Sequence, residues 1–137
     1  MSLDHNKAMV SWFLLDSFNQ RNVEVVDDVF ASDHHLHSPA LETGTVEGTE
    51  AIKRMIHDYL DDVEEGARVT CTIQKQIAEG EWVTTYYTLE TTNYTSEGPR
   101  NEAYWGVIIS CIAHNTIQES YVVAQEVSPE ERKKVFN

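Results

Sequence analysis

The sequence predicts an α+β domain in which about three N-terminal helices precede a curved antiparallel sheet and enclose an apolar pocket. Apolar residues recur at three- and four-residue spacing in the first half of the chain, as in helices. In the second half they alternate with polar residues, as in half-buried strands. The chain has 137 residues, which is about the length of one domain. We therefore expect a single domain over residues 1–137.

Three helices are predicted in the first half. The first covers residues 4–20, and its wide apolar stripe suggests a helix clamped between other elements, with Trp12 in the core. Asn22 can cap a short second helix that contains Val25, Val26, Val29 and Phe30. The third helix follows a candidate cap at Thr49. Its apolar residues line one face: Ile52, Met55, Ile56, Tyr59, Leu60 and Val63.

Four strands are predicted in the second half, over residues of about 69–77, 82–94, 102–113 and 116–125. In the first strand, Val69, Cys71, Ile73 and Ile77 fall on one face. Gly98-Pro99 should break the chain before the third strand.

Two further local signals concern the end of the chain. His114-Asn115 should form a two-residue hairpin turn, because Asn tolerates a positive φ. After the last strand, Ser128-Pro129-Glu130-Glu131 predicts a short terminal helix over about 128–135.

The composition disfavours two classes of partner. The formal net charge is −13, from 10 Lys plus Arg against 23 Asp plus Glu, which repels nucleic acid and anionic lipid. No stretch of about 18 apolar residues or signal peptide is evident, so we expect a cytoplasmic protein without a membrane partner. Cys71 and Cys111 are expected to be free thiols, although a disulfide between them stays possible.

Four short motifs, in this order, resemble the SnoaL-like polyketide cyclases of the NTF2-like superfamily. They are Asn19-Gln20-Arg21-Asn22 with Val25, Val26 and Phe30, then His37-Ser38-Pro39 with Gly48, then Glu79-Gly80-Glu81-Trp82-Val83, and finally Ile117-x-Glu119-x-Tyr121. The resemblance extends from about Asn6 to Gln125 and implies an NTF2-like fold around a small-molecule pocket.

One position departs from the pattern of that family. The cyclases continue the last motif to an Asp that acts as general acid/base for ring closure, and here the spacing places Gln125 at that position. Gln can hydrogen-bond a carbonyl but cannot transfer a proton at neutral pH. Glu119, Tyr121 and Gln125 share one face of a regular strand, so Glu119 is a candidate relocated base, with a carboxylate at the pocket rim as the alternative. A β-bulge would turn Gln125 away from the pocket.

His37 is the second candidate for proton transfer, by its match to the family motif. In an extended segment His35 points the same way as His37, and His34 points opposite. Neither a metal nor another cofactor is expected, because the His spacing matches no known zinc pattern. The remaining candidates for substrate binding are aromatic, with Tyr87 and Tyr121 preferred over core positions such as Tyr59: Tyr87, Tyr104, Trp105 and Tyr121.

Three functions stay open. The first is a cyclase or isomerase that binds a small apolar carbonyl compound and abstracts a proton next to the carbonyl. Its catalytic residues would be His37 and Glu119, with Gln125 and Tyr87 orienting the substrate oxygen. The alternative is a binding domain that lost catalysis when Gln125 replaced the acid/base. The third function is a structural protein whose open sheet face mainly builds a homodimer, as in many NTF2-like domains. The resemblance implies a homodimer under all three functions.

Overall fold

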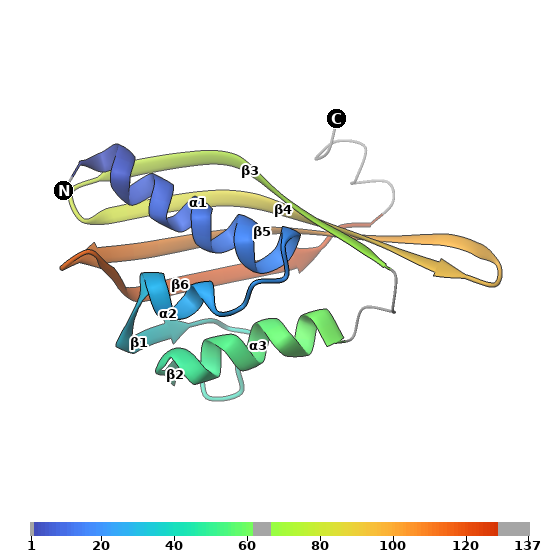
Figure 1. The fold of residues 1–137 in the computed structure, drawn as a ribbon, viewed down its shortest axis with the longest axis horizontal. Coiled ribbons are helices and arrows are strands. Elements are labelled where there is room, and N and C mark those ends of the chain that lie inside the picture. Colours follow the sequence, from blue (N-terminus) through green and yellow to red (C-terminus); the bar gives the residue numbers. More distant parts are fainter. Residues whose placement is uncertain (1, 62–66, 129–137) are drawn as a thin grey trace.

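The computed structural model describes residues 2–61 and 67–128 and shows helices on one face of a curved sheet (Figure 1). The sheet has six strands in the order β2-β1-β6-β5-β4-β3. The helices are α1 (Leu3–Asn19), α2 (Val25–Val29) and α3 (Thr49–Asp61). The strands are β1 (Phe30–His37), β2 (Thr45–Glu47), β3 (Arg68–Glu79), β4 (Trp82–Thr95), β5 (Gly98–Ala113) and β6 (Thr116–Glu126). The predicted α+β class is confirmed.

The sheet is mixed, whereas an antiparallel sheet was expected. β1 runs parallel to β6, with Leu36 opposite Ser120. All other neighbouring strands are antiparallel. Neither β1 nor β2 was predicted, because they lie in a stretch of His, Ser, Gly and Pro residues without clear alternation of apolar side chains.

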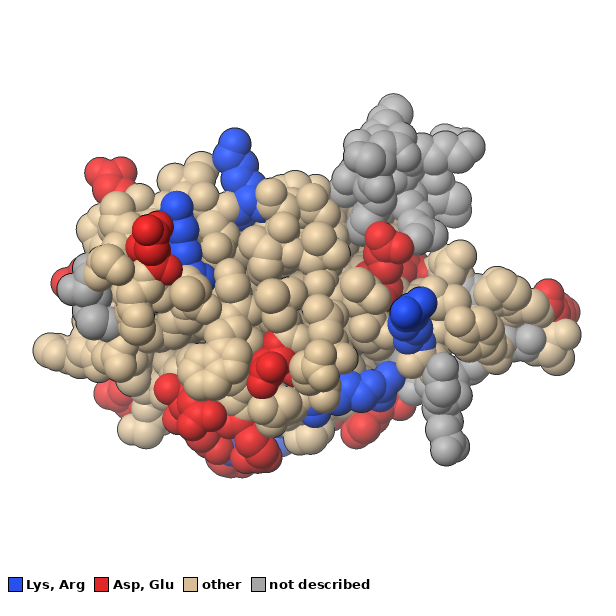
Figure 2. Space-filling model, turned by 45° about the horizontal axis from the view of Figure 1, so that its top comes forward, with Lys and Arg blue, Asp and Glu red and all other residues tan. Residues whose placement is uncertain are grey.

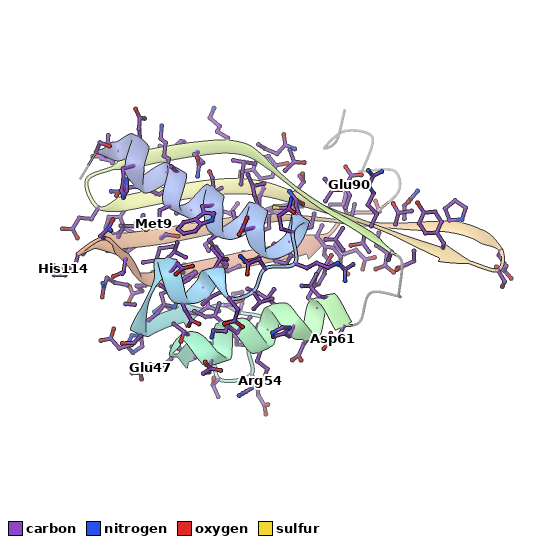
Figure 3. All side chains as sticks on the ribbon, viewed as in Figure 1. Met9, Glu47, Arg54, Asp61, Glu90 and His114 are labelled. Carbon is purple, nitrogen blue, oxygen red and sulfur yellow. The ribbon has the colours of Figure 1, made fainter. Side chains whose placement is uncertain are left out.

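The helices begin and end close to their predicted positions, but two details differ. α2 is capped at Glu24 with no side-chain hydrogen bond, and the predicted cap Asn22 instead donates to Asp16 Oδ2 at 2.8 Å. Trp12 is 47% exposed, so its expected place in the core is wrong. α1 contacts the sheet mainly at β3, and one side of it is therefore free to face solvent. Figure 3 shows Met9 among the side chains between α1 and the sheet, where it is buried.

A β-bulge reverses the facing of residues in the second half of β3. The register shifts between Ile73 and Lys75, so that one extra residue, Gln74, separates the two halves of the strand. Val69 and Cys71 point into the core as predicted, but Ile77 is 60% exposed. The prediction for Ile77 was wrong because it assumed unbroken alternation.

The hairpins explain the lengths of the strands. His114 and Asn115 both have positive φ, at 53° and 61°, which confirms the predicted two-residue turn. Gly98 does not end the ordered structure: it pairs with Thr95 and starts β5, so the third predicted strand is longer than expected. The hairpin of β4 and β5 extends beyond the helices (Figure 1).

The outer edge of the sheet at β3 is covered by a side chain of α1. Asn19 Oδ1 accepts from the backbone N–H of Cys71 at 2.6 Å, and Asn19 Nδ2 donates to its carbonyl at 3.0 Å. This pair replaces the hydrogen bonds that a further strand would make. It also fixes the end of α1 against the sheet, on the side where the cavity lies.

Val63 and the predicted terminal helix over 128–135 fall almost wholly outside the described residues. Among residues 2–61 and 67–128, no helix has the length and apolar character that crossing a membrane requires. Figure 2 shows Asp and Glu side chains spread over the visible face, with fewer Lys and Arg, as the net charge of −13 requires.

Candidate functional site

An apolar cavity of about 240 Å³ lies between the helices and the inner face of the sheet. α1 and α3 form its roof, and β1, β4, β5 and β6 form its floor. Its lining is Phe13, Leu14, Phe18, Phe30, Leu36, Ile52, Met55, Ile56, Tyr59, Tyr87, Leu89, Ile108, Val122 and Ala124. None of these side chains carries a carboxylate, an imidazole or an ammonium group.

Two tyrosines provide the polar groups of this lining. The Tyr59 hydroxyl is already engaged, 2.7 Å from Thr91 Oγ1. The Tyr87 hydroxyl has no hydrogen-bond partner among the described residues. Burial raises the pKa of Tyr87 to about 12, with smaller contributions from Cys71 and Tyr59. Tyr87 is therefore a neutral phenol at physiological pH, free to donate a hydrogen bond to a bound molecule.

A second β-bulge, in β6, decides which residues of the last strand reach the cavity. Ile112 pairs with Ile117 but Cys111 pairs with Glu119, so Gln118 is an extra residue. Ile117 points inward and is fully buried, and regular alternation would then turn Glu119 inward as well. The bulge shifts the alternation by one residue, so that Val122 and Ala124 line the cavity instead.

Glu119, Tyr121 and Gln125 consequently lie on the outer face of the sheet. They share one face, as predicted, but that face is not the one that lines the apolar cavity. The expectation that Tyr121 and Gln125 contact a ligand in this cavity is therefore corrected. Of the residues expected to bind substrate, Tyr87 lines the cavity and Tyr104 lies on the same inner face, 6.2 Å from the Tyr59 ring.

The two histidines predicted for the site are also on the outer face. His37 Nδ1 lies 2.8 Å from Thr45 Oγ1, and its Nε2 lies 3.4 Å from Glu119 Oε2. The second distance is at the outer limit of a hydrogen bond, and Nε2 has no partner with good geometry. His35 Nε2 lies 3.6 Å from Glu47 Oε2. The structure thus brings His37 and Glu119 together, as a catalytic pair would require, but away from the apolar cavity.

Tyr121 completes this outer cluster. Its ring stacks on His37 with centroids 4.6 Å apart, and its hydroxyl donates to Glu119 Oε1 at 2.9 Å. That hydrogen bond, followed by the longer contact with His37 Nε2, lowers the pKa of Glu119. A shallow hollow of about 290 Å³ opens beside the cluster, lined by His37, Ser38, Pro39, Gly44, Tyr121, Val122 and Val123. These contacts favour the carboxylate form of Glu119 and make it a weaker base than an ordinary Glu.

Trp105 and Gln125 form a separate pair on the outer face. They are opposite each other in the register of β5 and β6. The Trp105 ring contacts Tyr86 edge to face, with centroids 6.5 Å apart. Neither residue belongs to the cavity lining, so the expectation that they bind a ligand there is corrected by the same alternation that places Tyr87 and Tyr104 inside.

His34 is the histidine on the inner side, and no role was predicted for it. It is fully buried, its Nε2 lies 3.0 Å from Ser120 Oγ, and the Phe30 ring meets it edge-on at 4.5 Å. Burial, reinforced by the nearby His35, lowers the pKa of His34 to about 4, so its ring is neutral. The available signal in the sequence was the alternation of side chains along the strand. It correctly predicts that His34 faces the opposite side of the sheet from His35 and His37.

Metal binding finds no support among the described residues, where no three His, Cys, Asp or Glu side chains are arranged to hold an ion.

Cys71 and Cys111 are free thiols, which confirms the preferred prediction. Burial raises the pKa of Cys71 to about 12, so this thiol is unreactive.

Comparison with protein families decides what kind of domain surrounds this cavity. The model of the SnoaL-like domain matches residues 13–120, which is most of the chain. This chain belongs to the SnoaL-like domain family. It therefore has the SnoaL-like fold of the NTF2-like superfamily, which confirms the prediction made from the order of the four motifs.

Solved structures of several other proteins share this fold over most of the chain. TsrD from Streptomyces laurentii superposes with a TM-score of 0.72 at 15% identity, over 91% of each chain. IdmH from Streptomyces antibioticus, a proposed polyketide cyclase, gives 0.69 at 17% identity over 88% of this chain and 91% of its own. An LEH-like epoxide hydrolase from M. tuberculosis gives 0.66 at 14% identity, over 90% and 84%. No curated protein sequence is significantly similar. At these identities the SnoaL-like likeness establishes the fold, which hosts several chemistries.

Proposed function

We propose that this SnoaL-like domain binds a small, largely apolar molecule that carries an oxygen, and that it does so in the cavity between the helices and the sheet. The observation that supports this most is the composition of the lining, which is apolar except for two tyrosines. Sites for small molecules combine such walls with a few placed polar groups. Here the Tyr87 hydroxyl is the polar group without a hydrogen-bond partner among residues 2–61 and 67–128.

The same lining favours binding without turnover. Proton abstraction next to a carbonyl needs a base within hydrogen-bond reach of the substrate. The described lining offers only phenols, and the raised pKa of Tyr87 makes its phenolate rare at neutral pH. The carboxylate and imidazole expected to act, Glu119 and His37, are on the other face of the sheet.

An NMR experiment in D₂O with methyl naphthyl ketone tests this function. We expect the ketone signals to broaden with added protein, while the methyl protons next to the carbonyl exchange no faster than in buffer. A neutral two-ring fluorescent competitor, 1-naphthylamine, should be displaced by the ketone if both occupy the cavity. If neither compound binds, the proposal is refuted. If the methyl protons of the ketone exchange faster than in buffer, the enzymatic function is favoured.

A second candidate function, a polyketide cyclase or isomerase, rests on the contact between His37 and Glu119. The 3.4 Å approach of these side chains, with Tyr121 bonded to Glu119, forms a polar cluster beside the hollow on the outer face. In this function His37 and Glu119 would move the proton of a carbonyl compound bound in that hollow. The low pKa of Glu119 makes it a weak base, and this ranks the function second.

The outer face also supports the prediction of a homodimer. Large apolar side chains are exposed on four neighbouring strands: Ile77, Trp82, Ile109, Tyr121 and Val123. Monomers rarely leave a contiguous apolar patch of this kind in water. A second copy of this chain is the partner we propose for it.

A further inference from the structure

Tyr87 lies on the floor of the cavity, and its ring covers Gly106 of the neighbouring strand. They are opposite each other in the register of β5 and β4, and both point to the inner face. A Cβ placed on Gly106 would lie 2.5 Å from Tyr87 Cζ, 2.6 Å from its Oη and 2.9 Å from its Cε1. These separations are shorter than carbon atoms tolerate, so the Tyr87 ring occupies the space that any other side chain at position 106 would need.

The ring therefore lies flat across β5 instead of standing up into the cavity. With a side chain at position 106, the ring would have to tilt toward α1 and α3, where the free volume is. Position 106 thus controls both the depth of the cavity and the place of the Tyr87 hydroxyl, which has no hydrogen-bond partner in the described part of the chain. The backbone itself does not require glycine here, because Gly106 is not among the residues with positive φ.

Charge and volume limit what can enter. No described lining residue is charged, so an ionised ligand would lose its hydration without gaining a partner. The volume of about 240 Å³ is below the range of roughly 300–1,000 Å³ that is usual for drug-sized ligands. A molecule of about two fused rings fits this size better than a larger ring system.

From this geometry we infer that the cavity selects neutral, two-ring carbonyl compounds and that Gly106 determines this selection by letting Tyr87 lie flat beneath the ligand. The inference rests on the proposed function, because it specifies the ligand of the same site. The carbonyl oxygen accepts the hydrogen bond of Tyr87, and the rings contact the aliphatic walls. Gly106 acts through Tyr87 and is therefore a positioning residue.

The test measures the affinity of the wild-type chain and of Gly106→Ala for matched ligands. 1-Naphthylamine and its analogue 5-amino-1-naphthalenesulfonate have two rings each and differ by one sulfonate, and acetophenone, methyl naphthyl ketone and acetylanthracene differ in ring number. We expect the wild type to bind the uncharged probe at least about tenfold more tightly than the sulfonate, and the two-ring ketone more tightly than its one- and three-ring analogues. In Gly106→Ala the affinity for the two-ring ketone should fall by about tenfold, with less than about threefold loss for acetophenone.

A double-variant cycle with Tyr87→Leu identifies the cause. When the ring is absent, adding Gly106→Ala should change ketone affinity by less than about twofold, because nothing remains for the Cβ to displace. Val107→Ala, a change on the opposite face of the same strand, is the control and should bind like the wild type. If Gly106→Ala alone fails to fold, folding of the double variant supports the contact. If Gly106→Ala and the double variant both fail to fold while Tyr87→Leu folds, the proposed contact between Gly106 and Tyr87 is overturned.

Three other results are decisive. Unchanged ring preference in a folded Gly106→Ala variant overturns the role of Gly106 but leaves the proposed function intact. Equal or tighter binding of the sulfonate overturns the selection for neutral ligands. A wild-type chain that binds none of these compounds refutes the proposed function itself, and the inference with it.

Discussion

His34 Nε2 lies 3.0 Å from Ser120 Oγ in the buried layer where β1 meets β6, and neither residue is exposed to solvent. The other ring nitrogen, Nδ1, is buried without a hydrogen-bond partner among the described residues. This site accommodates a neutral imidazole far better than a charged one, which explains why the pKa of His34 falls from 6.5 to about 4. The acid stability of the domain should depend on this residue.

We predict that the free energy of unfolding decreases as the pH falls from 6.5 to 4. The sign follows from linkage: the unfolded chain binds a proton at His34 below pH 6.5, while the folded chain resists it down to about pH 4. The contribution of His34 is thus fully present above pH 6.5 and is lost toward pH 4. A shift of this size corresponds to roughly 3 kcal/mol at most.

Urea unfolding at pH 7.5 and pH 4.5 would measure this effect in the wild type and in His34→Gln. The Gln side chain does not ionise between pH 7.5 and pH 4.5, so the free energy of unfolding of the variant should decrease less between the two pH values. Equal losses in both proteins would show that His34 does not control the pH dependence. The comparison between proteins is needed because carboxylates also affect stability at low pH.

Tyr87→Phe should weaken the binding of methyl naphthyl ketone by about five- to tenfold, because the hydrogen bond to the carbonyl is lost. Ethylnaphthalene has a similar shape but no oxygen, so its affinity should not change. Isothermal titration or competition with 1-naphthylamine gives both values. A similar loss for the hydrocarbon would mean that the Tyr87 hydroxyl supports the shape of the cavity and not the ligand.

Glu119→Gln separates the two candidate functions. For a ligand in the apolar cavity, affinity should stay within about twofold of the wild-type value, since Glu119 lies on the other face of the sheet. Any proton exchange on the ketone should also be unaffected. If the wild type does catalyse exchange, and the variant loses it by about a hundredfold or more, the outer cluster of His37, Glu119 and Tyr121 is the active site.

Val123→Asp should shift the chain from dimer to monomer in sedimentation velocity experiments. Val123 is 49% exposed, near Tyr121 and Ile109 on the outer face, and a carboxylate buried there in two copies would be costly. Leu15→Asp on α1 makes the same kind of change on the helical side and should leave the assembly unaltered. A wild-type monomer at micromolar concentration would contradict the prediction directly.

Local patterns were enough to predict most elements of the fold. The stripe of α3 and the turn at His114-Asn115 depend on neighbours within a few residues, and both predictions are confirmed. The short strands β1 and β2 were not predicted, because they have little alternation of their own and are held by pairing with each other and with β6. Their formation depends on long-range contacts that no local pattern records.

The candidate site was predicted in part. Tyr87 was expected in the pocket and lines it, and His37 and Glu119 were expected to act together and are in contact. Gly106 was not recognised, since its importance comes from the ring on a neighbouring strand. A glycine in a predicted strand was the available signal, because it indicates close approach by another group.

Local sequence patterns and motifs were sufficient to predict the α+β class, the approximate places of three helices and four strands, and the family to which the chain belongs. They were not sufficient to predict which residues face the cavity. One extra residue in β3 and one in β6 shift the alternation of the residues that follow, so that Ile77, Glu119, Tyr121 and Gln125 face outward. The physical reason is that side chains alternate with a period of two, and the pairing with a distant strand sets where that alternation is interrupted.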